Sequence, residues 1–406
     1  MDEFVDKVNL ITIERAINII GSLRKGTPPR DDVDLFAIGR EELVDYFREK
    51  FSEIAKYDTQ GVKFISADYG HGKTHFLDML AKIALEQNFI VSIVTLDREN
   101  APFNKLEKVI PLIMKGITTP KSKEKVNSLE QILDEWAEKV KGLNYNEVLF
   151  YIDDQQELQV LPPDFRFKLA DYAKAYNSPI GKSYEECLRI EKWFRGEETK
   201  SKTFKDIPEF LTSFIQLVKH LGYSGFVVML DEAESITLLS KITNRDQANE
   251  NLRQIIDNPE FRGFYFIFAS TPSFLSGEDD RGAQTYPALW RRITDPLGRG
   301  INQRSLEKII IELPELNESQ LKTIALRIKK IYEIAYNKSL DIVTDFHFGK
   351  LSKYIVERTD NSVRTLVRST VMLLDEASQN DELDANLIYE GIVENILQSE
   401  EYQRAK

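Results

Sequence analysis

Residues 67–74 read Ala67-Asp68-Tyr69-Gly70-His71-Gly72-Lys73-Thr74, and this stretch decides the expected fold. An apolar run at 62–66 comes before it and predicts a buried strand, while the stretch at 74–87 predicts a helix. A second apolar run follows at 89–96. Strand, glycine turn, helix and strand in this order are typical of a parallel α/β sheet.

The turn fits the phosphate-binding pattern G-x-x-x-x-G-K-[ST] except at its first position, where Ala67 replaces glycine. Glycines let backbone N–H groups point at phosphate oxygens, and the following helix N-terminus adds partial positive charge. We expect Lys73 to reach the β- and γ-phosphates of ATP and the Thr74 hydroxyl to bind Mg²⁺. The predicted nucleotide-binding residues are Asp68, Tyr69, Gly70, His71, Gly72, Lys73, Thr74 and His75.

Three residues of this stretch leave alternatives open. Alanine restricts the backbone more than glycine does, so Ala67 could weaken nucleotide affinity or turnover. His71 and His75 are expected on the surface of the loop and the helix, rather than as metal ligands, because nothing pairs with them. The simpler interpretation is a glycine turn with an incidental Gly-Lys-Thr, which the strand–loop–helix context disfavours.

A pair of carboxylates ends the apolar run at 225–230. The run is continuous, as expected for a central strand covered on both faces, and Asp231 and Glu232 follow it. ATP hydrolysis needs a carboxylate for Mg²⁺ and a group that activates water. We predict that Asp231 binds Mg²⁺ through water and that Glu232 orients or deprotonates the attacking water. An acidic turn after a core strand is the alternative.

Polar and basic side chains follow the next apolar run, at 263–269. Thr271, with Ser270 nearly equivalent, is expected to position the water, although both also suit a simple strand-end turn. Arg291 and Arg292 come later, where an arginine of an AAA+ ATPase commonly reaches the nucleotide of a neighbouring subunit. The sequence does not choose between these two arginines, and an exposed basic helix end is the alternative.

A further arginine belongs to a predicted helix start near residue 362, where Asn361 or Ser362 suits the cap position. Arg364 lies in the first turn of this helix. It resembles the sensor-2 arginine of AAA+ lids, which faces the nucleotide as the lid closes. A solvated helix arginine is the alternative.

Composition bounds the class of protein. The chain has 406 residues, 54 Lys or Arg against 66 Asp or Glu, a net charge of −12 and one cysteine, Cys187. Intrachain disulfides and cysteine-based zinc sites are therefore excluded. No apolar run reaches the roughly 18 residues of a membrane span, and a cytoplasmic protein is expected. Net acidity disfavours coating nucleic acid through bulk charge, but leaves room for local basic positions.

The expected architecture is α/β, a P-loop AAA+ core with a parallel sheet, a helical insertion and a helical C-terminal lid. Residues 1–35 are predicted as an N-terminal helical segment and 36–312 as the ATPase core, with the insertion at about 104–220. Residues 313–406 are predicted as the lid.

The chain resembles the BREX phage-defence ATP-binding protein family (BrxD-like), relatives of the archaeal Orc/Cdc6 AAA+ initiators. The resembling segments are 15–17, 23–29, 38–41, 68–77, 96–106 and 230–234. Of these, Ile38-Gly39-Arg40-Glu41 is similar to the Val-Gly-Arg-Glu box of initiator-type AAA+ proteins. That similarity places Ile38, Gly39 and Arg40 near adenine.

The resemblance implies an ATPase in phage defence that binds ATP or ADP and Mg²⁺, works with a helicase or other components, and contacts DNA. Basic positions for such a contact are Arg299, Arg304, Lys329 and Lys330, which equally suit a solvated face. A homo-oligomer follows if an arginine acts across an interface. Two alternatives stay open: a nucleotide-gated scaffold with little turnover, and a DNA-binding replication initiator.

Overall fold

The computed structural model describes residues 2–122, 128–179, 181–197, 207–276, 281–294, 306–358, 362–379, 391–392 and 395. The chain forms two compact units. The helical unit is made of Met1–Asp45, Ala67–Leu80 and Glu312–Lys406, and the sheet unit of Tyr46–Ser66 and Ala81–Ile311. The domain boundaries expected at 35/36 and 312/313 stay a prediction.

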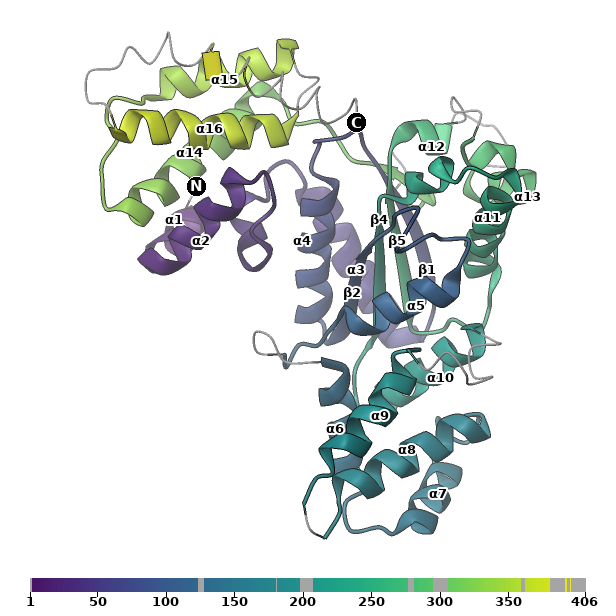
Figure 1. The fold of residues 1–406 in the computed structure, drawn as a ribbon. Helices are drawn as coiled ribbons and strands as arrows, with labels where there is room; N and C mark the ends of the chain where they lie inside the picture. The colour runs from purple at the N-terminus through teal and green to yellow at the C-terminus, as the bar shows by residue number, and fades with distance from the viewer. Residues whose placement is uncertain are drawn as a thin grey trace. The chain divides into compact units, whose positions relative to one another are not determined.

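One six-stranded sheet forms the centre of the sheet unit, with the strand order β3-β2-β4-β5-β1-β6 (Figure 1). The pairs β2–β4, β4–β5 and β5–β1 are parallel, and β2–β3 is antiparallel. The bounds are β1 Gly61–Ser66, β2 Phe89–Thr95, β3 Ile117–Thr118, β4 Gly225–Asp231, β5 Phe264–Ser270 and β6 Ile310–Glu312. The predicted α/β class with a mostly parallel sheet is confirmed.

The two central strands are buried over their whole length, which explains their continuous apolar sequences. Register places Leu230 of β4 beside Phe268 of β5, and Ser270 of β5 beside Ser66 of β1. Parallel strands carry their carboxyl ends to the same edge, so the segments after β1, β4 and β5 all start there.

The edge strands β3 and β6 were not predicted. They have two and three residues, too few for a periodic pattern, and β3 makes one edge of the sheet antiparallel. Phe64 N–H donates to Ile309 O at 2.7 Å, just before β6. These two short edge strands do not change the parallel pairing of β2, β4, β5 and β1.

The predicted helical insertion lies between β2 and β4, with β3 inside it. Its helices pack through α6–α8, α7–α8 and α8–α9 contacts (Figure 1). Within it, Trp136 Nε1 donates to Leu169 O at 3.0 Å. The helices are α5 Leu106–Lys115, α6 Ser128–Lys139, α7 Tyr145–Asp154, α8 Pro163–Tyr176, α9 Tyr184–Phe194 and α10 Ile207–His220.

Five helices follow β4 and β5, before β6, in the described part of the chain. They are η3 Ala233–Leu238, α11 Ile242–Asp257, α12 Pro272–Ser276, η4 Ala283–Thr285 and α13 Pro287–Ile293. Among them, α11 contacts both η3 and α13. Two longer helices, α3 Glu41–Tyr57 and α4 Lys73–Glu86, run from the helical unit into the sheet unit along the chain.

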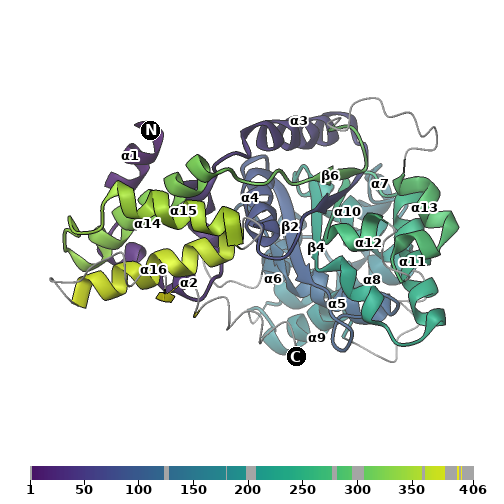
Figure 2. The same cartoon turned by 90° about the horizontal axis from the view of Figure 1, so that it is seen from above.

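In the helical unit, α14 packs against α2, α15 and α16, as Figures 1 and 2 both show. Its buried side chains recur at helical spacing, and Asn317 with Gln320 forms a capping box at its start. The other helices are α1 Asp2–Asn9, α2 Ile13–Arg24, η1 Arg30–Phe36, α15 Asp345–Arg358 and α16 Val363–Gln379.

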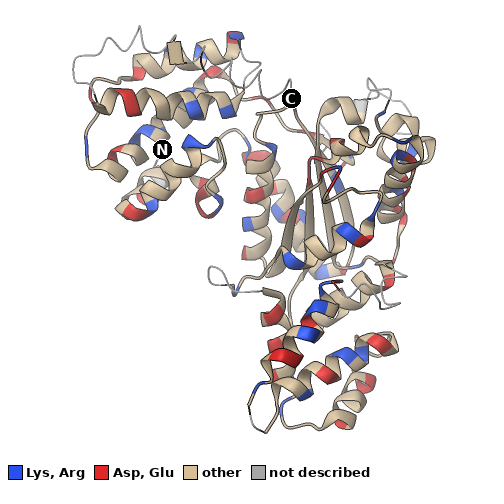
Figure 3. Cartoon of the chain, viewed as in Figure 1, with Lys and Arg blue, Asp and Glu red and all other residues tan. Residues whose placement is uncertain are grey.

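Acidic and basic residues are interspersed along the described helices (Figure 3). Within the described part of the chain, no helix combines the length and apolarity needed to cross a membrane.

Candidate nucleotide-binding site

The phosphate-loop candidate joins β1 to α4, as the sequence predicted. Gly70 and Gly72 have φ of +85° and +88°, a region that glycine enters without steric cost. Phe76 N–H donates to Gly72 O at 2.9 Å, which starts the helical ladder of α4. Ala67 does not have a positive φ, so alanine at the first position of the loop causes no left-handed backbone strain.

Lys73 is a buried lysine at the start of α4. Its Nζ donates to Ala67 O at 2.7 Å and to Asp68 O at 3.3 Å, and lies 4.9 Å from the ring centroid of Tyr69. The ammonium group is thus held inside its own loop by backbone carbonyls. The contact at position 67 uses the backbone, which alanine supplies as well as glycine.

The two histidines of the loop differ from expectation. His71 is buried rather than on the surface, and it lies between two glycines of positive φ. His75 is partly buried, and its Nε2 lies 3.0 Å from Val33 O in η1. Burial lowers the pKa of His75 to about 4, so its imidazole is neutral at pH 7.

The start of α16 rests on this loop, within the helical unit. Arg364 N–H donates to Gly70 O at 3.1 Å, and a Cβ added to Gly70 would lie 2.5 Å from Ser362 Oγ. Ser362 Oγ accepts the N–H of Thr365 at 3.3 Å, the geometry of a helix cap. Asn361, the other predicted cap, lies outside the described residues.

The Ile38-Gly39-Arg40 segment packs near the start of α14. Gly39 has a φ of +68°, and a Cβ there would lie 2.4 Å from Gln320 Nε2. Arg40 is buried and donates to the Pro314 carbonyl, and desolvation lowers its pKa to about 10. The Arg40 guanidinium therefore holds the backbone at Pro314. Ile38 is the apolar residue of the segment.

The carboxylate candidates lie at the carboxyl edge of the sheet. Asp231 is the last residue of β4 and is buried, and its Oδ1 accepts the Glu232 N–H at 3.0 Å. Glu232 is exposed and has φ 57° and ψ 45°, the left-handed region. This conformation costs a non-glycine residue roughly 1–2 kcal/mol, and such strain concentrates at functional sites.

The polar candidates after β5 are both buried. Ser270 Oγ donates to Thr271 O at 3.2 Å, and Thr271 Oγ1 and Ser273 Oγ are 3.1 Å apart. Ser270 belongs to the strand, whereas Thr271 follows it. The preference for Thr271 stays a prediction.

Asn249 of α11 was not identified from the sequence. Its side chain is fully buried, and neither amide atom has a hydrogen-bond partner among the residues that the structure describes. Arg245, one turn earlier, donates from Nη1 to Leu239 O at 2.7 Å, beside the end of η3. The helical neighbours of Asn249, Ala248 and Leu252, are buried as well, so an amide flanked by apolar core positions is the signal that the sequence offers.

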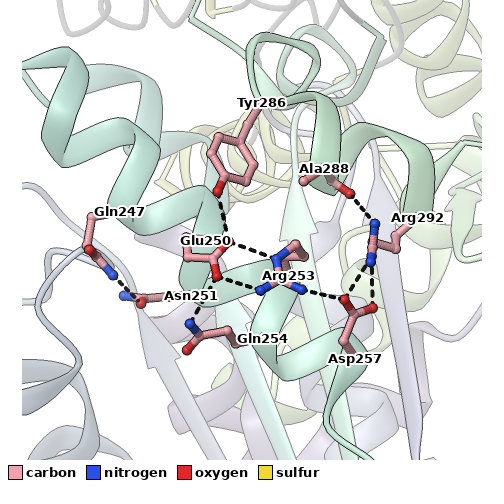
Figure 4. A network of polar contacts seen from close by, with 9 residues as sticks. All are labelled: Gln247, Glu250, Asn251, Arg253, Gln254, Asp257, Tyr286, Ala288 and Arg292. Carbon is pink, nitrogen blue, oxygen red and sulfur yellow. Dashed lines mark hydrogen bonds and ion pairs between the residues drawn. The ribbon is translucent and has the colours of Figure 1, made fainter.

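The two finger candidates occupy different environments on α13. Figure 4 shows the contacts of Arg292. Arg292 Nε donates to both carboxylate oxygens of Asp257 at 2.9 Å. Arg291 is exposed and makes no hydrogen bond or ion pair within the described ranges. Arg292 is thus bound within its own chain, which leaves Arg291 as the stronger finger candidate.

The basic residues considered for DNA contact also differ in whether they are bound within the chain. Lys329 Nζ donates to Val343 O at 2.8 Å and lies 3.7 Å from Glu333, whereas Lys330 is exposed. Arg299 and Arg304 lie outside the described residues.

Comparison with known proteins gives one family. A model described as "BREX system ATP-binding protein BrxC/D" matches residues 11–392. No curated protein gives a match. ORC2 of Aeropyrum pernix, in ADPNP–ADP complexes, is similar with 14% identity and a TM-score of 0.47 over 88% of this chain and 68% of that one.

The Walker-type ATPase paby2304 of Pyrococcus abyssi is similar with 13% identity and a TM-score of 0.41, over 91% of this chain and 76% of that one.

Proposed function

Because the chain belongs to the BREX system ATP-binding protein BrxC/D family, we propose that it hydrolyses ATP to drive or switch a nucleic-acid-associated assembly in phage defence. One observation carries the proposal: a buried lysine and two positive-φ glycines join β1 to the N-terminus of α4. This combination supports phosphate binding by backbone N–H groups, a helix N-terminus and an ammonium group.

In this proposal, Lys73 exchanges the carbonyls of its own loop for phosphate oxygens, and Gly70 and Gly72 let the backbone approach them. The Thr74 hydroxyl and the Asp231 carboxylate are oxygen donors of the type that Mg²⁺ prefers. When bound, Mg²⁺ supplies positive charge against the phosphates. Glu232 orients the attacking water, and Thr271 or Ser270 supports that orientation.

Arg364 is proposed to sense the nucleotide, since its backbone already contacts Gly70. The Ile38-Gly39-Arg40 segment is proposed to lie near adenine, with Ile38 as the apolar contact. Arg291 is proposed to reach the nucleotide of a second copy of the chain. DNA and a helicase are the proposed partners of the assembly.

The test separates binding from turnover. Lys73→Ala is expected to abolish ATP binding measured by calorimetry, and Glu232→Gln to retain binding but stop phosphate release. Parental turnover in Glu232→Gln would contradict the assigned role. Turnover of the unchanged chain is measured with and without DNA, and strong stimulation by DNA supports a nucleic-acid-coupled motor.

A second candidate is a nucleotide-gated scaffold that binds ATP and hardly turns it over. The contact between the first turn of α16 and the phosphate loop favours it, because bound nucleotide could then move the lid without hydrolysis. Co-purified nucleotide without phosphate release, with or without DNA, supports the scaffold against the motor.

A further inference from the structure

Both ends of α13 are fixed to α11 by hydrogen bonds (Figure 4). Before its first turn, Tyr286 OH donates to Glu250 Oε2 at 2.8 Å. In its last turn, Arg292 Nε donates to both oxygens of Asp257 at 2.9 Å, and Arg292 Nη1 to Ala288 O at 2.9 Å. Leu289 is buried between these anchors.

The carboxylates that receive these bonds are themselves held in place. Arg253 donates to Glu250 at 2.6 and 2.8 Å and to Asp257 at 2.7 Å, so one guanidinium links both acids. The hydrogen bond from Arg253 lowers the pKa of Glu250 to about 2, and the hydrogen bonds from Arg292 and, to a lesser extent, Arg253 lower the pKa of Asp257. Both are therefore ionised at neutral pH, and the network adds rigidity that a single exposed ion pair lacks.

The opposite face of α11 is bonded to the segments around the carboxylate edge. Arg245 Nη1 donates to Leu239 O at 2.7 Å, and Asn251 Nδ2 donates to Phe103 O at 2.8 Å. Leu239 is the C-cap of η3, the short helix that follows Glu232 directly. One helix thus joins the chain after Glu232 to α13.

Fixing α13 fixes the direction of Arg291. This side chain is exposed and has no polar partner among the described residues, whereas the neighbouring Arg292 donates to Asp257 and to Ala288 O. Because Leu289 and Ile293 are buried and both ends of α13 are anchored, the helix cannot rotate freely about its axis. The network thereby limits the positions that the Arg291 guanidinium can reach.

From this arrangement we infer that Glu250 and Asp257, acting through Tyr286 and Arg292, are positioning residues that present Arg291 to the nucleotide of a second copy of the chain. The inference rests on the proposed ATPase function and deepens it. Arg292, although adjacent to Arg291, serves as an anchor and does not touch nucleotide.

The experiment compares four variants of the full chain: Arg291→Ala, Asp257→Asn, the double variant, and Glu260→Gln as control. Glu260 is an exposed carboxylate three residues after Asp257 and outside the network. Arg291→Ala is expected to lower kcat by about a thousandfold, the range of an arginine finger. Asp257→Asn is expected to lower kcat by roughly tenfold to a hundredfold, since small misplacements cost that much, with KM little changed.

Non-additivity is the decisive result. Asp257→Asn is expected to cause no further loss of kcat in the Arg291→Ala background. Adding Lys73→Ala protein, which keeps Arg291, is expected to restore turnover in the Asp257→Asn variant by supplying the arginine from a neighbour. Additive losses, parental kcat in Asp257→Asn, or no rescue by mixing would overturn the inference and leave the ATPase proposal intact.

If the unchanged chain shows no turnover, the ATPase proposal fails, and sedimentation with a non-hydrolysable ATP analogue tests the inference separately. Analogue-dependent self-association that weakens equally in Arg291→Ala, Asp257→Asn and the double variant supports it. No self-association, or association unchanged in these variants, overturns it.

Discussion

The backbone N–H of Arg364 donates a hydrogen bond to the carbonyl oxygen of Gly70 at 3.1 Å. A Cβ added to Gly70 would lie 2.5 Å from Ser362 Oγ, closer than real Cβ contacts. The first turn of α16 therefore lies directly on the phosphate loop. A side chain at position 70 therefore requires the Ser362 hydroxyl to shift.

Alanine substitutions of the two loop glycines should separate backbone strain from this clash. Both positions have positive φ, so each substitution is expected to cost about 1–2 kcal/mol of unfolding free energy. A Cβ at Gly72 meets nothing within 4 Å, so Gly70→Ala is expected to be the more damaging change. Urea unfolding measures the cost of each substitution. In a Ser362→Gly background, which lacks the clashing hydroxyl, Gly70→Ala and Gly72→Ala are expected to cost the same unfolding free energy.

The loop after α2 is expected to support the arginines of α16. Gly26 has a φ of +72°, and a Cβ there would lie 3.1 Å from Arg368 Cδ and 3.2 Å from Arg364 Cγ. Gly26→Ala should therefore displace both side chains and lower ATP turnover. This effect on turnover should vanish in an Arg364→Ala background, and an additive loss would contradict it.

Gly21 is the matched control for that substitution. It lies inside α2, and a Cβ there meets nothing within 4 Å. Gly21→Ala is expected to leave turnover unchanged and to raise unfolding free energy by about 0.5–1 kcal/mol, because glycine in a helix costs that much relative to alanine.

The main features of the fold were predictable because they depend on local sequence. Continuous apolar runs identify β4 and β5, and the glycine–lysine loop identifies the β1–α4 connection. The edge strands β3 and β6 were not predictable, since their pairing depends on neighbours rather than on their own pattern. Tertiary contacts of this kind leave no periodic signal.

Within the candidate site, residue types were predictable but their environments were not. Arg291 and Arg292 are adjacent and chemically identical, and only Asp257, over 30 residues away in sequence, distinguishes them. His71 was expected on the surface, but it is buried, because burial of a loop residue depends on tertiary packing that the local sequence does not reveal.

Stability should decrease in mild acid because of His75. Burial lowers its pKa in the folded chain to about 4 from the ordinary 6.5, so only the unfolded chain takes up this proton between those values. Unfolding free energy should fall as pH drops from 7 toward 4, with a His75 share of about 2 kcal/mol at pH 5. Urea unfolding at pH 7 and pH 5 measures it.

His75→Gln should reduce this loss, since glutamine does not titrate and still offers an N–H to Val33 O. Part of the loss should remain, because burial also lowers the pKa of His220. An unchanged pH dependence in His75→Gln would show that the imidazole is not the source.

Glu232 should combine strain with function, and two substitutions separate them. Its φ of 57° costs a glutamate but not a glycine, so Glu232→Gly is expected to raise unfolding free energy by about 1 kcal/mol, whereas Glu232→Gln keeps the strain. Both should lose phosphate release and keep ATP binding.

Asn337→Gly, at φ 48° where α14 ends, is the control expected to leave turnover unchanged. Thermal unfolding measures the stability of the variants, and calorimetry measures their ATP binding. A Glu232→Gly variant less stable than Glu232→Gln would mean that the backbone at position 232 is not strained.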